Sequence, residues 1–407
     1  MAGGVGSGNS WIWALVLGGI GVGAGVGMEH FHVGPHWLVG TLLALGGLAV
    51  IFGACESMIK AVEGAAALLG WDEFVGGTVA GIASNIPELV MLGFIVAREP
   101  RVAFILVALT LHIGALAFGT YCGLLPRGPS GKASMPEPLV KLSTDEYAIA
   151  GVVLLATGML MLALKLFGGE TGHIQALYAT DLYLIGTALL TVKIVAVYRL
   201  ITLFSGETSA EATAHDGGVE SVDVPSETSR EAPSQEGQPD ATIGGIVGYT
   251  LLGVGTSVVG GHAVGDFAEM LVGSLRAAGY SEMVGALILS FFACSGIFVM
   301  IITAHLKGMH NLAVANVSSA VTQVPYIVLP VVLIMHAAFA QTGIVPMLDG
   351  GGVLPIDVDT TAVVLLGFPP MLILYKAISD DGKVNWVETV GMTAVFVLVL
   401  YFLGVHG

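Results

Sequence analysis

Long apolar runs separated by short polar breaks dominate this sequence. A Gly-rich run over 11–28 comes first and predicts an extra membrane helix, because about 20 apolar residues span the hydrocarbon core of a bilayer. Ten further runs form two groups of five, on either side of a polar stretch from Ser205 to Asp240. These runs are 37–70, 74–97, 102–125, 147–167, 177–204, 243–278, 283–306, 312–340, 361–378 and 384–405.

Composition supports a protein that lies in a membrane. Hydrophobic residues make up 55% of the 407 positions and charged residues only 11%, against roughly 25% charged in soluble domains. The 58 glycines suit closely packed membrane helices. We predict an all-α polytopic membrane protein, integral to the plasma membrane. Its predicted parts are a tail with an extra helix (1–36), a first five-helix unit (37–204), a linker (205–241) and a second five-helix unit (242–407).

The predicted linker is strongly acidic. Nine acids and one arginine between Glu207 and Asp240 give it a charge of −8, half of the total of −16. With almost no large apolar residues it cannot bury a core, so we expect it to be disordered and dispensable for activity. If it is cytoplasmic, nine Lys and Arg residues lie inside and four outside, as the positive-inside rule requires. No basic patch indicates nucleic-acid binding.

The two five-helix units repeat each other. The stretch from Leu69 to Gly76 aligns with the stretch from Ala278 to Gly285 at an offset of 209 residues. A shift of one residue near Glu99 then gives an offset of 210, which places Thr110 opposite Ala320. Because each unit has an odd number of helices, the second copy is inverted in the membrane. Inverted repeats bring broken helices together at mid-membrane, where many transporters bind ions.

One apolar run contains a feature unsuited to a plain membrane helix. Within the stretch from Gly76 to Val90, Pro87 is followed at once by Glu88, with Ser84 and Asn85 just before them. Proline breaks or kinks a helix, and an acid at this depth is costly and usually faces a cavity or pathway. We therefore predict an ion site at a helix break. The alternative is a simple kink with a protonated Glu88 that only packs.

Both units resemble the sodium/calcium exchanger family of the cation/calcium exchanger superfamily. Each repeat of that family reads close to G-[ST]-S-x-P-E, followed by R-G-x-P-x-[LI]-A-x-G-N. Here the first unit gives Ala83-Ser-Asn-Ile-Pro-Glu88 and Arg98-Glu-Pro-Arg-Val-Ala103, and the second gives Lys307-Gly-Met-His-Asn-Leu-Ala-Val-Ala-Asn316. The first unit keeps the Pro-Glu pair and lacks the Gly-Asn pair. The second keeps an Ala-Asn version and lacks Pro-Glu.

The resemblance implies a set of cation-binding residues. Glu88 matches the cation-binding glutamate of the first repeat, Ser84, Asn85 and Gly81 match its neighbours, and Thr110 matches a serine of the third helix. In the second repeat Ile297 takes the place of the glutamate, with Ser290, Ala293 and Cys294 as its neighbours. Calcium prefers six to eight oxygen ligands including carboxylates, so a single acid better suits Na⁺, H⁺ or a divalent site completed by water.

The third helix of the second unit offers compensating polar groups. Asn316, Ser319 and Gln323 are spaced i, i+3, i+7 and therefore share one helix face, which we expect to meet Glu88. Plain hydrogen bonding between helices is the alternative for this face. His112 is either a proton acceptor near the site or a core histidine. Other candidates for the pathway are Ser290, Cys294 and Thr322, and candidates for access routes or helix ends are Glu56, Glu63, His262, Asp266 and Glu269.

The resemblance implies secondary active antiport, in which Na⁺ or H⁺ is exchanged for Ca²⁺ or another cation. A non-transporting homologue that acts as a sensor or partner subunit is the alternative, favoured by the missing second acid. The sequence shows no nucleophile–base pair that would suggest an enzyme, and no ATP-binding motif that would suggest a pump. We expect no cofactor, with membrane lipid and small inorganic cations as the only partners, and the oligomeric state stays open.

Histidine and cysteine patterns add little. His30, His32 and His36 lie close together, but no Cys or acid cluster completes a metal-ligand spacing, so a wet interfacial loop is favoured over a metal site. The three cysteines, Cys55, Cys122 and Cys294, lie far apart in apolar runs and indicate no disulfide framework.

Overall fold

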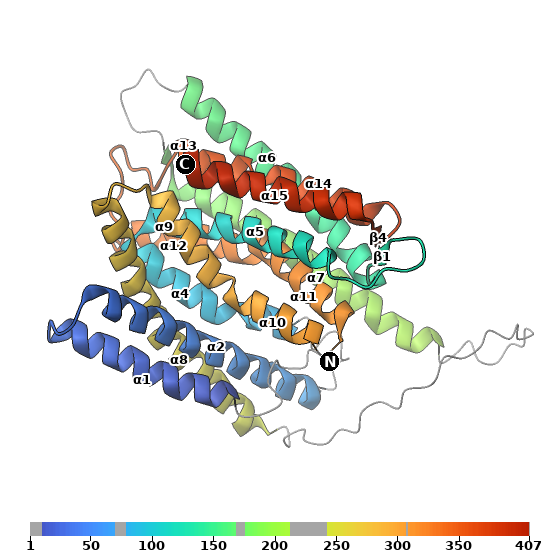
Figure 1. Ribbon diagram of the computed structural model, residues 1–407, viewed down its shortest axis with the longest axis horizontal. Helices are drawn as coiled ribbons and strands as arrows, with labels where there is room; N and C mark the ends of the chain where they lie inside the picture. The colour runs from blue at the N-terminus through green and yellow to red at the C-terminus, as the bar shows by residue number, and fades with distance from the viewer. Residues whose placement is uncertain (1–9, 70–78, 168–175, 212–241, 307, 407) are drawn as a thin grey trace, which may run out of the picture.

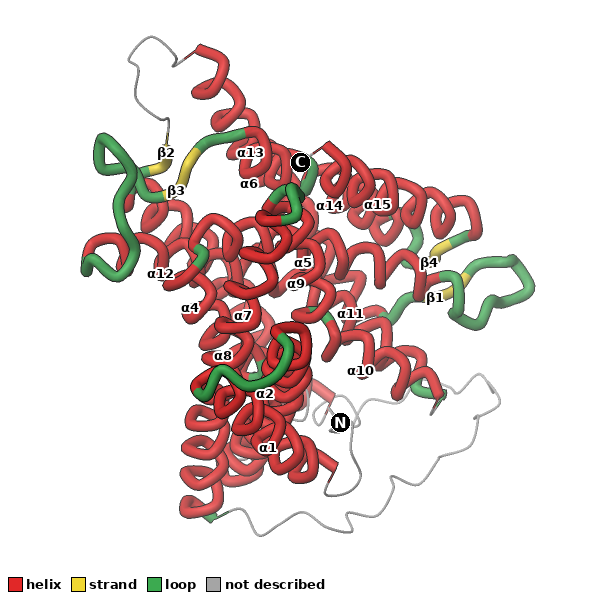
Figure 2. The backbone as a smooth tube through the Cα atoms, turned by 60° about the vertical axis from the view of Figure 1, so that its left-hand side comes forward, coloured by secondary structure: helices red, strands yellow, loops and turns green. Residues whose placement is uncertain are grey.

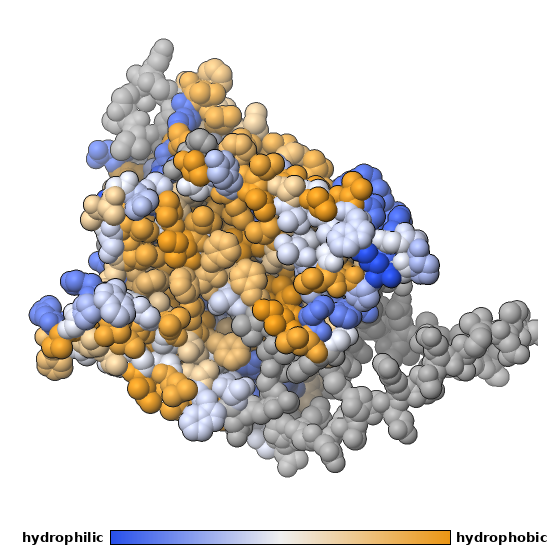
Figure 3. Space-filling view, in the orientation of Figure 1, coloured by the Kyte–Doolittle hydropathy of each residue, from blue (hydrophilic) through white to orange (hydrophobic). Residues whose placement is uncertain are grey.

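The computed structural model of the protein describes residues 10–69, 79–167, 176–211, 242–306 and 308–406 (Figure 1). Within these ranges, ten helices are long and apolar enough to cross a membrane. The face of the molecule shown in Figure 3 is largely apolar, as expected for helices that face lipid. The protein is an integral, multi-pass membrane protein, as the sequence predicted.

The first half of the chain holds the extra helix and the first repeat. Its elements are α1 (Ser10–His30), α2 (His36–Leu69), α4 (Asn85–Arg98), α5 (Pro100–Cys122), α6 (Glu137–Phe167) and α7 (Ala179–Glu211). The end of α7 corrects one prediction, because residues 205–211 are helical and not part of a disordered linker. Extending a helix that already exists costs little, and Ala and Glu residues in this stretch favour it. Residues 212–241 of the predicted linker lie outside the described residues.

The second half follows the same plan with more interruptions. Its helices are α8 (Ile243–Ala277), α9 (Glu282–Ala293), α10 (Ser295–Leu306), α11 (His310–Gln323), the π-helix η2 (Val324–Val328), α12 (Leu329–Gln341), α13 (Val358–Leu365), α14 (Phe368–Ser379) and α15 (Trp386–His406). The run predicted over 283–306 is therefore two short helices. The third helix of this repeat carries a π-turn that α5 lacks.

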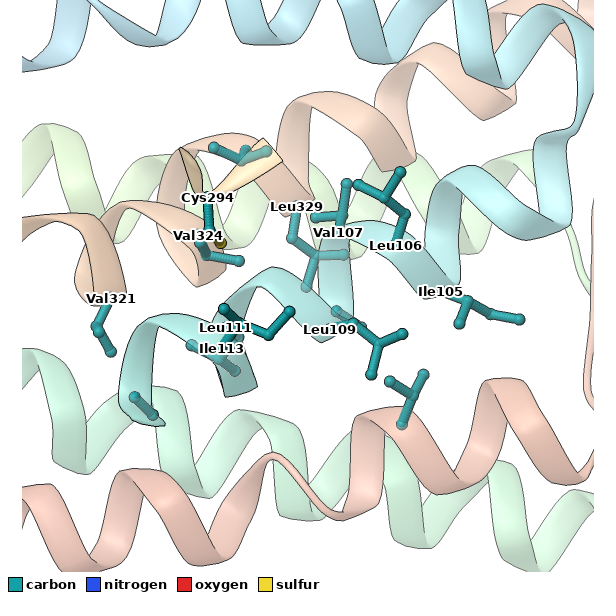
Figure 4. Packing of buried hydrophobic residues seen from close by; sticks show 14 of the residues in the cluster. Ile105, Leu106, Val107, Leu109, Leu111, Ile113, Cys294, Val321, Val324 and Leu329 are labelled. Atoms are coloured by element: carbon teal, nitrogen blue, oxygen red, sulfur yellow. The ribbon is translucent and has the colours of Figure 1, made fainter. Parts of the chain in front are cut away.

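The helices form three layers (Figure 1). Helices α1, α2 and α8 make one outer layer, and α6, α13, α14 and α15 make the opposite one. The middle layer contains α4, α5 and α9 to α12, with α7 packed on α12. Helix α5 is the centre of the molecule, since nearly all of its side chains are buried. Figure 4 shows its apolar residues, such as Leu109 and Ile113, close to Cys294 and Val324 of the second half.

Two short antiparallel ribbons reveal the symmetry of the repeats. Strand β1 (Ala133–Ser134) pairs with β4 (Lys383–Val384), and β2 (Ala176–Leu177) pairs with β3 (Leu354–Pro355). Each ribbon joins the loop after the third helix of one repeat to the loop after the fourth helix of the other. Figure 2 shows the ribbons on opposite sides of the molecule, which we call the β1–β4 end and the β2–β3 end. Two inverted repeats require this crossed pairing of loops, so the predicted fold class is confirmed.

Glycines bring the outer layer together. A Cβ atom on Gly18 of α1 would lie 2.8 Å from the carbonyl oxygen of Gly46 on α2. On the other side of α2, a Cβ atom on Gly260 of α8 would lie 2.9 Å from the carbonyl oxygen of Gly47. Small residues thus allow backbone contact between helices, which is how helices associate where lipid removes the hydrophobic driving force.

Candidate functional site

The second helix of each repeat is interrupted at an equivalent point. In the first repeat a turn at Ser84 separates the helical residues 79–83 from α4, and in the second repeat a turn at Cys294 separates α9 from α10. Pro87 lies in the first turn of α4, where its missing N–H leaves no hydrogen bond unmade. The break therefore precedes Pro87 by three residues.

Polar side chains satisfy the backbone around the Ser84 break. The carbonyl oxygen of Gly81 accepts hydrogen bonds from Ser84 Oγ at 2.7 Å and from Asn85 Nδ2 at 3.4 Å. The thiol of Cys55, on α2, donates to the carbonyl oxygen of Ser84 at 3.3 Å. Part of the backbone freed by the break is thus paired within the protein, as a buried helix end requires.

The polar face of α11 meets this break. Asn85 Nδ2 donates to Gln323 Oε1 at 3.0 Å, and Gln323 Nε2 donates to Ser319 Oγ at 2.8 Å. The Gln323 amide also lies over Gly81, where a Cβ atom would approach Nε2 to 3.6 Å. The two repeats thus meet at the two elements that the sequence predicts. Asn316, on the same helix, is only partly buried.

Glu88 lies one turn beyond the break, in the first turn of α4. The side chain is partly buried, and no hydrogen bond or ion pair joins its carboxylate to another residue in the described part of the chain. It lies near the sulfur atoms of Cys55 and Cys294. The N-terminal end of a helix favours negative charge, so the position suits a carboxylate with a cationic ligand as its partner.

Thr110 and His112 have different surroundings although both lie on α5. The carbonyl oxygen of Thr110 is 3.8 Å from the sulfur of Cys294, so Thr110 lies beside the break of the second repeat. His112 is buried, and its Nε2 lies 3.1 Å from the carbonyl oxygen of Val363 on α13. The structure therefore places His112 at the α5–α13 contact and supports its interpretation as a core histidine.

Among the described residues, the side chains of two of the lower-ranked candidates form hydrogen bonds only within their own helices. Ser290 Oγ donates to the carbonyl oxygen of Leu287, and Thr322 Oγ1 donates to that of Ser319. In the described residues, no group of three or more His, Cys, Asp or Glu side chains could hold a metal ion, the histidines at the α1–α2 corner included.

Known proteins share this architecture and part of the sequence. The family model described as "Sodium/calcium exchanger protein" matches residues 245–405. A Ca(2+)/H(+) antiporter of Synechocystis sp. (strain PCC 6803) is 25% identical over 379 residues, covering 89% of this chain and 91% of the relative. These matches support a divergent relationship between this chain and the sodium/calcium exchanger family.

Solved structures of exchangers have the same fold. The crystal structure of an H⁺/Ca²⁺ exchanger, CAX, superposes with a TM-score of 0.58 and 14% identity, covering 97% of this chain and 90% of that one. The Ca²⁺/H⁺ antiporter YfkE gives 0.58 and 15% identity, covering 96% of this chain and 98% of that one. At such low identity these likenesses show the fold alone.

Within the exchanger fold, the two breaks correct the alignment of the repeats. Ser84 and Cys294 differ by 210, as do Pro100 and His310 at the starts of α5 and α11. The counterpart of Glu88 is therefore Phe298 and not Ile297. The one-residue shift lies before the break, not near Glu99 as the sequence suggested. The conclusion about charge is unchanged, because Phe298 is as apolar as Ile297.

A network of ion pairs lies at the β2–β3 end of the molecule. Arg98, at the end of α4, pairs with Asp266 of α8, whose other oxygen lies 2.9 Å from His262. Arg101 contacts Glu282, Asp357 and Asp359, with 2.8 Å to Asp357. These pairs join the two repeats across more than 160 positions of sequence, so no local motif revealed them. They give Asp266 a structural partner in place of an open access route.

A second set of contacts joins α11 and η2 to α6. Ser318 Oγ lies 2.6 Å from the hydroxyl of Tyr147, and Tyr326 of η2 donates to the backbone carbonyl of Glu146 at 2.6 Å. Glu146 itself forms a partly buried ion pair with Lys193 of α7 at 2.6 Å. Sequence reasoning missed this group, although Lys193 within a membrane run was a signal for a buried partner. The contacts fix the helix that presents Ser319 and Gln323 to the break.

Proposed function

We propose that the protein is a secondary active cation antiporter with its ion site at Glu88. The observation that carries this proposal is a carboxylate without a partner among the described residues, next to a helix break that faces the amide of Gln323. An acid in that setting is expensive for a membrane protein to keep unless a ligand offsets its charge. The relatives named above as Ca²⁺/H⁺ antiporters support exchange of this kind.

The oxygen atoms around Glu88 define what the site can bind. We assign Glu88 as the charged ligand and the oxygens of Gly81, Ser84, Asn85, Thr110, Ser319 and Gln323 as candidate neutral ligands, with Asn316 nearby on the same face. One carboxylate offsets one charge, which suits Na⁺ or H⁺ directly. Calcium in this site needs water to complete its six to eight oxygen ligands. We infer exchange of Na⁺ or H⁺ for Ca²⁺ or another cation.

The inverted repeats supply the means of exchange. Two halves that rock about a site between them open it to each side of the membrane in turn, without moving the ligands far. The ion pairs of Arg98 and Arg101 join the halves at one end, and the β1–β4 ribbon joins them at the other. Alternation requires some of these contacts to break and re-form.

A non-transporting role is the second candidate. Phe298 stands where the second acid of the family pattern would be, so the protein has lost half of that pattern. A sensor needs only to bind an ion and change shape, and one carboxylate is enough for that. The two functions differ in one observable, which is net movement of ions across a sealed membrane.

Purified protein in sealed proteoliposomes tests the proposal. Flux is measured under separate Ca²⁺, Na⁺, K⁺ and pH gradients for the wild type, Glu88→Gln, Glu88→Asp and the exposed control Glu29→Gln. Glu88→Gln keeps the shape and removes the charge, so it should abolish exchange, whereas Glu88→Asp should retain a weakened site. Protons compete with cations for one carboxylate, so flux in the wild type should fall as pH falls.

Two outcomes would decide against this reading. If Glu88→Gln carries flux at the wild-type rate while Glu29→Gln does the same, Glu88 only packs. If the folded wild type binds cations but moves none under any gradient, the protein is a sensor or partner subunit.

A further inference from the structure

Two histidines and a tyrosine gather at the β1–β4 end, apart from the Glu88 site. His305 lies in the last turn of α10, His310 begins α11, and Tyr121 lies in the last turns of α5. The tyrosine hydroxyl is 3.4 Å from Nδ1 of His305 and 3.5 Å from Nδ1 of His310. Tyr121 is only 2% exposed, whereas both histidines are partly exposed at the corner. Two ring nitrogens therefore converge on one buried oxygen.

The spacing of the two rings matches a metal site. Their centroids are 5.0 Å apart. Two imidazoles that bind one tetrahedral Zn²⁺ through nitrogen, at about 2.0–2.1 Å, place their ring centres about 5 Å apart. The hydrogen bonds to Tyr121 are long, so neither nitrogen is held tightly by its present partner. Both Nδ1 atoms lie within 3.5 Å of the same hydroxyl and therefore face a common point.

We propose that His305 and His310 form a two-histidine site for a late divalent transition metal such as Zn²⁺. Imidazole nitrogen suits Zn²⁺, Ni²⁺ and Cu²⁺, whereas Ca²⁺ and Na⁺ prefer oxygen. The site is therefore chemically distinct from the Glu88 site. Water completes the coordination, and the hydroxyl of Tyr121 is placed to hydrogen-bond a metal-bound water. Protonated imidazole cannot ligate, so binding weakens as pH falls.

A bound metal has a mechanical consequence. His305 and His310 lie on the two helices that meet at this corner, and Tyr121 belongs to the other repeat. A metal that bridges the histidines fixes α10 against the start of α11, the helix whose far end presents Gln323. We expect Zn²⁺ to inhibit exchange by this clamp. The inhibition rests on the proposed function, whereas the binding itself does not.

Calorimetric titration of Zn²⁺ into purified, untagged protein at neutral pH tests the site. The wild type should bind one equivalent that His305→Gln and His310→Gln each weaken at least tenfold, since glutamine keeps the polarity and similar bulk but is not a comparable ligand. Tyr121→Phe should weaken binding less than either. The control variant carries Gln at His30, His32 and His36, the other histidine group at a helix corner, and should bind as the wild type does. Co²⁺ in place of Zn²⁺ should give the visible absorption of a tetrahedral nitrogen site, lost in both single variants.

Three results would overturn the proposal. These are an unchanged Zn²⁺ titration in folded His305→Gln and His310→Gln, loss of binding in the triple control variant, or a wild type that binds no Zn²⁺. The flux assay separates this inference from the proposed function. If exchange is intact and Zn²⁺ does not inhibit it, only the proposed clamp is rejected. If Zn²⁺ binds but the protein carries out no exchange, only the antiport function is rejected.

Discussion

Glu88 and Asp357 are both partly buried carboxylates, but they have opposite surroundings. Asp357 caps α13 through a reciprocal pair of hydrogen bonds with Thr360 and also binds Arg101 at 2.8 Å. Burial by itself raises the pKa of the Asp357 carboxyl, yet the bonds from Arg101 and Thr360 outweigh it and lower the pKa below its usual value of 3.8. Glu88 has no such partner among the described residues. A carboxylate that already has donors is structural, whereas one without them is available to a ligand.

Asp357 gives a stability effect with a defined pH range. Its lowered pKa means that the ionised form stabilises the fold above the unfolded pKa of 3.8, and that this contribution disappears as pH falls through the lower folded pKa. Asp357→Asn keeps a capping oxygen and loses the ion pair, so it should cost about 0.5–1 kcal/mol at pH 7. Asp357→Ala also loses the cap and should cost about 1–2 kcal/mol.

Thermal unfolding in detergent measures both variants against the wild type. At neutral pH the melting temperature should be highest for the wild type, lower for Asp357→Asn and lowest for Asp357→Ala. As pH falls through the lowered folded pKa of Asp357, the gap between the wild type and Asp357→Asn should close, because the protonated side chain is then a neutral cap like asparagine. A gap between these two that persists at low pH would mean that the ion pair with Arg101 is not what Asp357 contributes.

At the scale of the helix, glycine position decides how α8 packs. Gly260 faces α2, where a Cβ atom would lie 2.9 Å from the carbonyl oxygen of Gly47 and from Cγ1 of Ile51. Gly255, on the same helix, has nothing within 4 Å of a Cβ atom. Gly260→Ala should therefore cost about 1–3 kcal/mol through overpacking. Gly255→Ala should be neutral or stabilise by up to about 1 kcal/mol through helix propensity. Equal melting temperatures for the two variants would show that backbone contact does not hold α8 to α2.

The helices and the first break were predictable, but the second break and the exact register were not. Apolar runs indicated each helix of the described residues that is long enough to span a membrane, and Pro87 with Glu88 indicated the first break. The second break has no proline, so its position at Cys294 and the pairing of Glu88 with Phe298 came only from the structure. The continuation of α7 to Glu211 was missed because polar residues were taken to end the helix, although Ala and Glu propagate it.

At the scale of the whole molecule, symmetry was the strongest sequence signal. An odd number of helices in each repeat predicts inversion. The β1–β4 and β2–β3 ribbons, each of which pairs a loop of one repeat with a loop of the other, are its structural consequence. The meeting of Asn85 with Gln323 follows from that symmetry together with the polar face of α11. The ion pairs of Arg98 and Arg101, and the contact of Tyr121 with His305 and His310, depend on distances between repeats that no local pattern encodes.

The orientation of the molecule is a further prediction at this scale. The positive-inside rule places the 212–241 segment, and the β1–β4 end with it, in the cytoplasm. Arg230 is the only Lys or Arg from Ser205 to Asp240, so trypsin has a single cleavage site there, which divides the chain into 230 and 177 residues. Trypsin outside intact cells should not yield these fragments, whereas trypsin added to inside-out vesicles should. Arg230→Gln should abolish them in the vesicles and so identify the site. Fragments of these sizes from intact cells, absent in Arg230→Gln, would place the segment outside and reverse the orientation.

Replacing 212–241 with a neutral Gly/Ser chain of equal length should leave the proposed exchange in proteoliposomes unchanged, because the segment lacks the apolar residues to pack against the proposed ion site.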